Sequence, residues 1–214
     1  MGYKTPYIDT RFLKHINTDS IKTIFEIGAR DLRDSIALSN RFPEATIYAY
    51  ECNPATLDSC RANLRTFQPD RIIFNEIAVS DKVETLEFHN FLANKNPGAS
   101  SFYKRHDYDQ TQKTLHRIRT TTLEIELNKY NLKGIDLLCM DVQSWEVNIL
   151  KGINLKENRI SHVILESPNA DSEYNGAPSK QEVEDFMISN NYEIKEIIYE
   201  NTFEDNILFS LRDL

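Results

Sequence analysis

The chain has 214 residues, of which 40% are hydrophobic and 27% charged, a composition typical of a globular protein and unlike that of a disordered or fibrous one. Its formal net charge of −8 argues against a nucleic-acid backbone as partner, because phosphate binding depends on cationic neutralisation. No apolar run approaches the ~20 residues of a membrane span and the first residues hold no apolar signal core, so we expect a cytoplasmic protein.

The length fits one domain over residues 1–214, and it opens with a lead, 1–21, whose apolar residues predict one or two helical turns covering an edge of a sheet. The cysteines Cys52, Cys60 and Cys139 are odd in number and widely spaced. That spacing fits neither a disulfide framework nor a zinc ribbon, and we therefore expect packed thiols.

A strand, a tight turn and a helix are predicted after the lead. Residues 23–27 form a short apolar run with β-branched residues, which is broken at Gly28 and followed by Leu32, Ile36 and Ala37 at helical spacing. A glycine at this turn lets the backbone approach a bound molecule, and the first amides of the following helix have no partner within the helix. The turn is therefore a candidate ligand site.

A second strand, 45–50, ends at Glu51, which stands 23 residues after Gly28. Nucleotide-binding α/β folds place an acid ~20 residues after the glycine turn, where its two oxygens accept from the ribose hydroxyls. The G-x-G-x-x-G pattern is absent, since positions 30 and 33 are Arg30 and Arg33, and this disfavours a dinucleotide. A nucleoside ligand without pyrophosphate is favoured, and S-adenosylmethionine is the commonest of these. Without such a ligand, Gly28 would only end a strand and Glu51 would be a solvated charge.

The next elements are a helix over 54–66, opened by an Asn-Pro pair, and a third strand over 71–77. A turn over 78–81 is expected beside Glu51. Residues 86–90 then alternate between apolar and polar, which predicts a half-buried antiparallel strand.

Residues 92–111 have no periodicity and carry glycine, serines and aromatic residues. A loop of this length is uncommon unless it is functional or disordered. We expect a lid or substrate loop that is mobile when empty and closes over an acceptor, with a passive insertion as the alternative. Its His106 is a candidate base or a surface residue.

A strand over 115–122 and a helix over 123–130 lead to the second anchor of the prediction. Residues 134–140 are almost continuously apolar, which is typical of a central parallel strand buried on both faces, and the run ends at Asp141. The carboxyl edge of such a sheet is where α/β proteins bind ligands. A short helix follows over 145–150.

The strand over 162–165 repeats this pattern and ends at Glu166. A capping box at 179–182 opens a helix to residue 190, and two strands, 193–199 and 206–211, are expected to form an antiparallel pair at one edge. Since parallel strands end at one edge, Glu51, Asp141 and Glu166 should share a face with Gly28.

Asp141, Glu166, His106 and His116 are the candidate general bases. Each has a plainer alternative: Glu166 fits a structural role equally well, and His116 fits a solvated strand position. A hard divalent ion could bridge Asp141 and Glu166, because such ions prefer oxygen ligands, but no metal is expected.

With these residues in place, the sequence over 22–211 resembles the FkbM family of S-adenosylmethionine-dependent methyltransferases. The matching segments are Glu26-Ile-Gly-Ala-Arg30, Tyr50-Glu-Cys-Asn-Pro54, Ile77-Ala-Val-Ser-Asp81, Gly98-Ala-Ser-Ser-Phe102, Thr121-Thr-Leu123, and Ile135 through Asp141-Val-Gln-Ser-Trp-Glu146 to Leu150-Lys-Gly152. The chain departs from the family's usual residues at Arg30 (usually Asn), Leu32 (Gly), Cys139 (Lys) and Ser144 (Gly).

The resemblance implies a Rossmann-like class I methyltransferase α/β sheet, mostly parallel with one antiparallel edge strand, that binds S-adenosyl-L-methionine and methylates a hydroxyl of a sugar, glycan or other natural product. Asp141, Glu166 and His106 are the catalytic candidates. The cofactor site that the resemblance implies consists of Glu26, Gly28, Ala29, Arg30, Asp31, Ser35, Glu51, Cys52, Ala78, Val79, Asp141, Val142 and Gln143.

Two other functions stay open from the sequence. A nicotinamide-dependent oxidoreductase shares this fold but would carry the missing glycine triplet. A nucleoside-sensing or scaffold domain that has lost its chemistry is the non-enzymatic alternative, with Leu32 and Ser144 as its best support.

Overall fold

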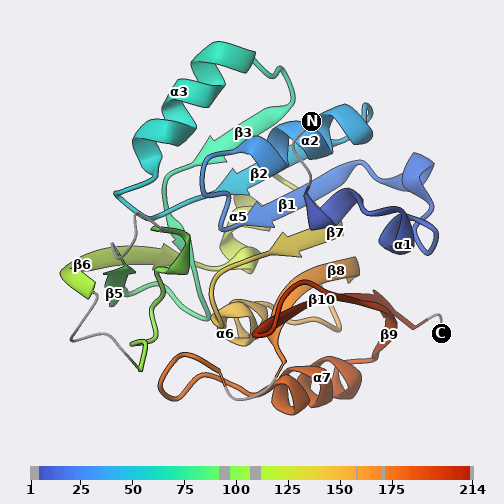
Figure 1. Ribbon diagram of the computed structural model, residues 1–214. Helices are drawn as coiled ribbons and strands as arrows, with labels where there is room; N and C mark the ends of the chain where they lie inside the picture. The colour runs from blue at the N-terminus through green and yellow to red at the C-terminus, as the bar shows by residue number, and fades with distance from the viewer. Residues whose placement is uncertain (1–4, 92–96, 107–111, 158, 170–171, 213–214) are drawn as a thin grey trace.

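The computed structural model describes residues 5–91, 97–106, 112–157, 159–169 and 172–212. In this part of the chain, seven strands form one sheet in the order β3-β2-β1-β7-β8-β10-β9 (Figure 1). Their bounds are β1 Thr23–Ile27, β2 Thr46–Tyr50, β3 Ile72–Asn75, β7 Gly134–Met140, β8 Arg159–Pro168, β9 Tyr192–Tyr199 and β10 Glu204–Leu211.

The predicted α/β fold with a mostly parallel sheet is confirmed. Strands β3, β2, β1, β7 and β8 pair in parallel, so that their carboxyl ends lie along one edge. The strand that runs against the others is β10, which pairs antiparallel with both β8 and β9. It was expected at the edge but lies one place inside, because β9 takes the outer position and completes the antiparallel pair.

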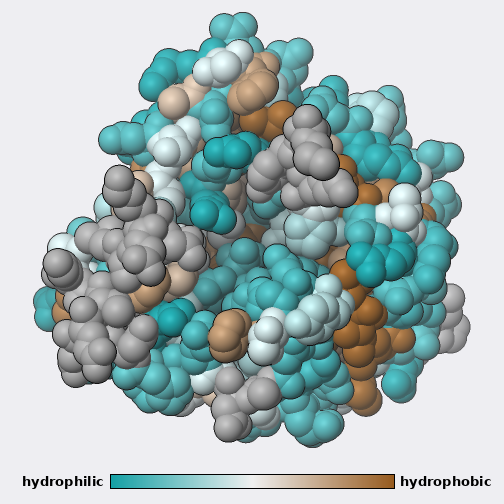
Figure 2. Space-filling model, viewed as in Figure 1, coloured by the Kyte–Doolittle hydropathy of each residue, from teal (hydrophilic) through white to brown (hydrophobic). Residues whose placement is uncertain are grey.

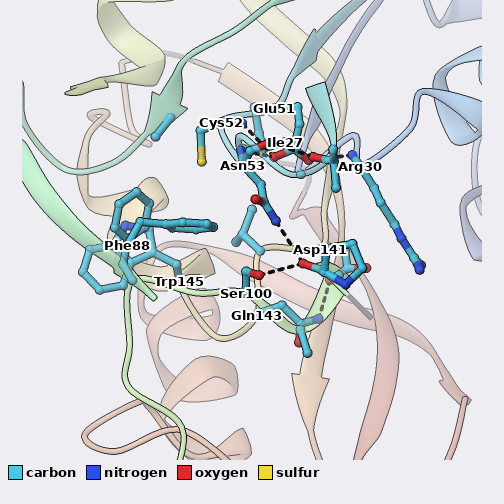
Figure 3. Close-up of a pocket in the computed structure, with 18 of the residues that line it drawn as sticks. Ile27, Arg30, Glu51, Cys52, Asn53, Phe88, Ser100, Asp141, Gln143 and Trp145 are labelled. Carbon is cyan, nitrogen blue, oxygen red and sulfur yellow. Dashed lines mark hydrogen bonds between the residues drawn. The ribbon is translucent and has the colours of Figure 1, made fainter. Parts of the chain in front are cut away.

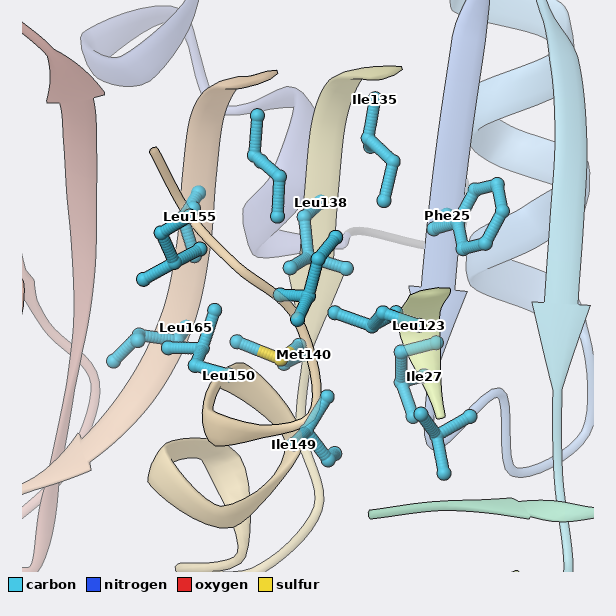
Figure 4. Packing of buried hydrophobic residues seen from close by; sticks show 14 of the residues in the cluster. Phe25, Ile27, Leu123, Ile135, Leu138, Met140, Ile149, Leu150, Leu155 and Leu165 are labelled. Atoms are coloured by element: carbon cyan, nitrogen blue, oxygen red, sulfur yellow. The ribbon is translucent and has the colours of Figure 1, made fainter. Parts of the chain in front are cut away.

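Strand β7 lies at the centre of the sheet, and its side chains alternate between two cores. Leu138 and Met140 join the core that packs under α5, α6 and α7 (Figure 4), whereas Leu137 and Cys139 join the core on the opposite face, toward α2 and α3. All four are fully buried. The continuous apolar sequence of this strand is thus explained by burial on both faces.

The helices are α1 Thr10–Leu13, α2 Arg33–Arg41, α3 Leu57–Phe67, α5 Leu123–Lys129, α6 Glu146–Lys151 and α7 Lys180–Ser189. The lead adds short 3₁₀ turns at Pro6–Ile8 and Thr18–Ser20. Its side chains Tyr7, Phe12 and Ile16 pack into the core shared with α2, so the lead covers a face of the sheet rather than only an edge. Among the described residues, no helix is long and apolar enough to cross a membrane.

A second, smaller sheet stands beside the main one in the order β4-β6-β5 (Figure 1), formed by β4 Ala78–Val79, β5 Thr85–Phe91 and β6 Gln112–Thr121. The pairing of β5 with β6 is antiparallel, as predicted from the alternation over 86–90. The turn expected over 78–81 is a two-residue strand here, because β4 pairs in parallel with the end of β6.

Hydrophilic residues cover most of the face of the molecule that Figure 2 shows.

Several predicted boundaries differ from the observed ones by two or three residues, and two of these differences have identifiable reasons. Helix α3 begins at Leu57 rather than at residue 54, because Asn53 caps a preceding turn by accepting from the backbone of Ala55 and Thr56. Strand β8 continues past Leu165 to Pro168, because β10 keeps pairing with it as far as Glu204. Glu166 therefore lies within a strand and not at its end.

Candidate functional site

A cavity of about 360 Å³ opens at the carboxyl ends of the parallel strands (Figure 3). The three carboxylates predicted to share this edge, Glu51, Asp141 and Glu166, all line it together with Gly28. The walls include the ends of β1 and β2, part of β8, the 97–106 segment and the 141–145 loop that follows β7. The fold therefore brings the three predicted carboxylates and Gly28 to one cavity.

Gly28 is confined by the neighbouring strand. It has a φ of +89°, and a Cβ atom there would lie 2.0 Å from the backbone oxygen of Asp141. Its N–H and that of Ala29 both donate to Tyr50 O over 2.9 Å, which ties the turn to the end of β2. The backbone directly after β7 thus requires glycine here, whether or not a ligand also approaches the turn.

The carboxylate of Glu51 sits in a nest of backbone amides. Oε1 accepts from Cys52 N over 2.7 Å and from Asn53 N over 2.6 Å, and Oε2 accepts from Arg30 N over 2.7 Å. Burial raises the pKa of Glu51, while these three bonds favour its charged form. Oε1 accepts two hydrogen bonds in this arrangement and Oε2 accepts one, so one oxygen retains a lone pair where the sequence suggested two free acceptors.

Several residues predicted for the cofactor site lie under or beside the turn rather than in the cavity wall. Glu26 is buried and accepts a hydrogen bond from Ser35 at the start of α2. Asp31 turns to the helix, where it accepts from Arg33 N and pairs with the Arg33 side chain. Neither these residues nor Ala29 line the cavity. Burial and the charge of Asp34 raise the pKa of Glu26 well above its usual range.

Three of the positions that depart from the resembled family share one backbone conformation. Arg30, Leu32 and Ser144 have φ values of 51°, 67° and 73°. Residues other than glycine and asparagine rarely adopt this left-handed region, which accounts for the Asn, Gly and Gly expected there. The side chain of Leu32 is fully buried in the core, and neither Leu32 nor Ser144 lines the cavity.

One end of the cavity is largely apolar. Its lining there includes Ile77, Ala78 and Val79, as well as Cys52, whose thiol pKa is raised well above its usual range by burial. Aromatic rings continue this wall: Phe102 lies 5.1 Å from Phe88 and 5.2 Å from Trp145 between ring centroids, and all three line the cavity. This end can hold a flat, weakly polar ring.

The opposite end is polar and acidic. Asp141 is exposed, and Gln143 Nε2 donates to its Oδ1 over 2.8 Å and to Glu166 Oε2 over 2.9 Å. Burial raises the pKa of Glu166 well above its usual range, and the charges of Asp141 and Glu204 act in the same direction. Glu166 thus holds its proton more readily than an exposed carboxyl group does, while the amide of Gln143 faces both groups.

Glu146 supports the loop from beneath. Its Oε1 accepts from Val142 N over 3.0 Å, and burial raises its pKa to about 8.

No group of three His, Cys, Asp or Glu residues among those described is arranged to hold a metal ion.

The expected lid lies partly outside the described residues, because 92–96 and 107–111 are not described. The described part, 97–106, packs onto the cavity: Ser101 N and O bond to His89, and Tyr103 packs 4.7 Å from Trp145 between ring centroids. The expected movement on acceptor binding stays a prediction.

The structure does not bring His106 into the cavity. Its backbone N–H donates to Glu173 O and its ring Nε2 lies 3.0 Å from Ser172 O, which holds the ring at an exposed position. His116 is half-buried in β6 opposite Phe88 and does not line the cavity either.

Sequence reasoning missed several residues of the cavity. Asn53 stands two residues after Glu51, and its position in the same motif could have revealed it. Others come from remote segments with no periodic signal: Arg105, Glu173 and Glu200 from loops and Glu204 from the start of β10 line the cavity, and Tyr174 contacts Gln143.

Comparison with known proteins adds sequence and structural relatives. A family model described as a methyltransferase FkbM domain matches residues 26–194. The chain is 26% identical over 140 residues to the 2-O-methyltransferase NoeI of Sinorhizobium fredii, in a match that covers 60% of this chain and 56% of that protein.

Among solved structures, the methyltransferase FkbM from Methylobacillus flagellatus has a TM-score of 0.60 at 12% identity, covering 88% of this chain and 43% of that one. TrmK from M. capricolum, solved with S-adenosyl-homocysteine, has a TM-score of 0.54 at 18% identity, covering 95% of this chain and 69% of that one. The chain spans about half the length of NoeI and of the Methylobacillus protein. At these identities the structural likenesses show a shared fold.

Proposed function

This chain belongs to the methyltransferase FkbM domain family, and on that premise we propose that it is an S-adenosylmethionine-dependent O-methyltransferase acting on a hydroxyl of a sugar or glycan. The observation that carries the proposal is the convergence of Glu51, in its backbone nest, and Asp141 on one cavity beside the Gly28 turn. The activity, the acceptor and the roles of the residues are all parts of this proposal.

We assign one half of the cavity to the cofactor and call it the cofactor end: Gly28, Glu51, Cys52, Ala78 and Val79. The fit supports this assignment. The volume of about 360 Å³ lies within the ~300–1,000 Å³ common for small-ligand sites, the apolar lining suits an adenine ring, and Glu51 Oε2 has a lone pair for a ribose hydroxyl. Glu26 and Ser35 would act from below by fixing the turn.

The other half is the acceptor end, formed by Asp141, Gln143, Glu166 and Glu204 and backed by Tyr174. When bound, S-adenosylmethionine supplies a methyl group activated on a sulfonium. The protein's task is then to hold an acceptor oxygen in line, and such positioning can be worth ~7–11 kcal/mol. Asp141 is exposed to the cavity and is the group we assign to orient or deprotonate the acceptor hydroxyl.

Glu166 is assigned a different role from Asp141. Its raised pKa favours the protonated form, which can donate a hydrogen bond to an acceptor oxygen. A carboxyl group that favours its protonated form, beside the exposed Asp141, suits an acid and a base working on one hydroxyl-rich molecule. The name of NoeI, a 2-O-methyltransferase, supports oxygen as the methylated atom, and the polar lining supports a sugar as its carrier.

The non-catalytic alternative rests mainly on the departures at Leu32 and Ser144, and their positions in the structure weaken it. Leu32 and Ser144 keep the left-handed backbone that their positions need, and their side chains lie outside the cavity. The glycine replacements therefore leave the space for a cofactor open.

The test is to incubate the protein with S-adenosylmethionine carrying a labelled methyl group and a panel of acceptors: free sugars, oligosaccharides, hydroxylated natural products and, as controls, amines and carboxylic acids. We expect label in the sugar-containing fraction and an equal yield of S-adenosylhomocysteine. Label only in amine or carboxylate products would refute the assigned acceptor class. Absence of S-adenosylmethionine binding by calorimetry would refute the function itself.

A further inference from the structure

The side-chain amide of Gln143 holds two carboxyl groups with its donor end and meets a tyrosine with its acceptor end. Both Nε2 protons are used, on Asp141 at 2.8 Å and on Glu166 at 2.9 Å. On the other side, Gln143 Oε1 lies 2.7 Å from the hydroxyl of Tyr174. Figure 3 shows the Gln143 side chain beside Asp141 in the cavity wall.

The orientation of this amide matters because its two ends have opposite hydrogen-bonding character. Turned by half a rotation about its last bond, the amide would present a carbonyl oxygen to Asp141 and Glu166, and of these only a protonated carboxyl group could donate to it. Tyr174 supplies the donor that the carbonyl end requires. The contact of the tyrosine hydroxyl with Oε1 thus acts together with the two carboxyl contacts on the orientation of the amide.

Tyr174 is itself held firmly as a donor. Its side chain is buried, with 4% of the residue exposed, and burial raises its hydroxyl pKa, so the proton stays on the oxygen. The same hydroxyl lies 2.8 Å from Ala99 O and can donate to one of the two acceptors at a time. A β-bridge between Arg105 and Tyr174 fixes the backbone, and the Arg105 side chain forms two 3.1 Å hydrogen bonds to Glu173.

The backbone under the amide needs support from the same two segments. Gln143 and Ser144 have φ values of 55° and 73°, which are unfavourable for side-chain-bearing residues. Ser101 Oγ donates to Gln143 O over 2.7 Å, and the hydroxyls of Ser144 and Ser172 lie 3.1 Å apart. Loop 143–144 is therefore clamped between residues 99–105 and 172–174.

From these contacts we infer that Tyr174 is a positioning residue of the methyl transfer: its hydroxyl fixes the Gln143 amide so that the NH₂ group faces Asp141 and Glu166 and sets their orientation toward the acceptor. The effect on turnover rests on the proposed function, whereas the effect on the amide does not. Tyr174 would act entirely through Gln143.

The structural part of this proposal is tested without any acceptor. The side-chain amide signals of Gln143, identified by their loss in Gln143→Met, are followed by ¹⁵N–¹H NMR between pH 4 and pH 9. Tyr174→Phe should change the chemical shifts of this amide. It should also displace the midpoint of their pH dependence by about half a pH unit or more, because the amide no longer holds both carboxyl groups. Unchanged signals and midpoint in Tyr174→Phe would overturn the proposal.

Tyr192→Phe is the matched control. The Tyr192 side chain is also buried, and its hydroxyl donates to a backbone carbonyl, Ile160 O, over 2.8 Å, just as Tyr174 contacts Ala99 O. It lies away from the cavity lining. A shift of the Gln143 signals in this control equal to that in Tyr174→Phe would assign the effect to general loosening and would also overturn the proposal.

The kinetic part uses an acceptor found with the labelled panel. Tyr174→Phe should lower kcat about tenfold and leave the KM for S-adenosylmethionine unchanged, and it should have no further effect in a Gln143→Met background. Independent, multiplicative losses in the double variant would overturn the route through Gln143. If Tyr174→Phe does not fold, Gln143→Met alone must show the same kcat loss, and wild-type kcat there refutes the proposal. Inactivity of the wild-type protein would count against the proposed function and leave the NMR result standing.

Discussion

The cofactor end and the acceptor end meet in one cavity but are built differently. At the cofactor end, backbone amides surround Glu51, two of them from the next two residues and one from the turn after β1. At the acceptor end, side chains from separate stretches of the chain contact one another, as Gln143 does with Glu166 and Tyr174. The first end follows from strand ends and tight turns, whereas the second exists only when remote segments have assembled.

The largest effect on stability should come from a substitution at Gly28, because this residue of the cofactor end packs against the backbone of Asp141 in the acceptor end. In Gly28→Ala, the new Cβ would meet Asp141 O at 2.0 Å with φ at +89°, so we expect a loss of roughly 3 kcal/mol or more in the free energy of unfolding. Urea denaturation measures this loss. Gly176→Ala is the control, since Gly176 has φ +77° and no atom within 4 Å of the added Cβ, and it should cost only about 1 kcal/mol. Equal losses would show that β7 does not confine the turn.

A second change separates binding from chemistry. Asp141→Asn removes the charge that faces the acceptor while keeping the side chain's shape, so turnover should fall ~10²-fold with cofactor affinity within a few fold of wild type. Asp136→Asn, at the other end of the same strand, where Asp136 accepts from the backbone of Lys22 and Thr23, should leave turnover near normal. Parallel loss of affinity and turnover in Asp141→Asn would place Asp141 in the cofactor end instead.

Stability should also depend on pH through Glu146, which supports the loop that carries Asp141 and Gln143. Its pKa of about 8 in the folded state exceeds the usual 4.5, so the folded state keeps a proton that the unfolded state releases. This contribution is complete below pH 4.5 and is lost as the pH rises through about 8, with a slope of about −1.4 kcal/mol per pH unit between them. Glu146→Gln should remove most of that slope in urea titrations at pH 5 to 8. As a control, Glu44→Gln at an exposed position should leave the slope of the free energy of unfolding against pH unchanged. An unchanged slope in Glu146→Gln would contradict the raised pKa of Glu146.

The sequence predicts the cofactor end better than the acceptor end, for physical reasons. The apolar runs give β1 and β7 nearly to the residue, because burial on two faces leaves a continuous pattern. Gly28 is identified as a special position, but its tightest constraint, the carbonyl of Asp141, is a contact between strands that no local pattern encodes. Tyr174 has no signal, since its place depends on how a loop packs.

Glu166 shows a second limit of prediction from the sequence, which concerns where a strand ends. The apolar run over 162–165 predicts that the strand ends at Glu166. Glu166 lines the cavity, but β8 continues through it because β10 offers further backbone partners. The extent of a strand is set by its neighbour as well as by its own residues. The place of His106 also depends on a neighbouring segment, since its bonds to the 172–173 segment turn it away from the cavity.

Calorimetric titration of S-adenosylhomocysteine into wild type, Glu51→Ala and Glu166→Gln tests the division into two ends most directly. Glu51 is the cofactor end's acceptor, whereas Glu166 belongs to the acceptor end and contacts Gln143. We expect Glu51→Ala to raise the Kd about tenfold or more, equivalent to about 1.4 kcal/mol, and Glu166→Gln to leave it within about twofold. An unchanged Kd in Glu51→Ala, or an equal rise in both variants, would contradict the account.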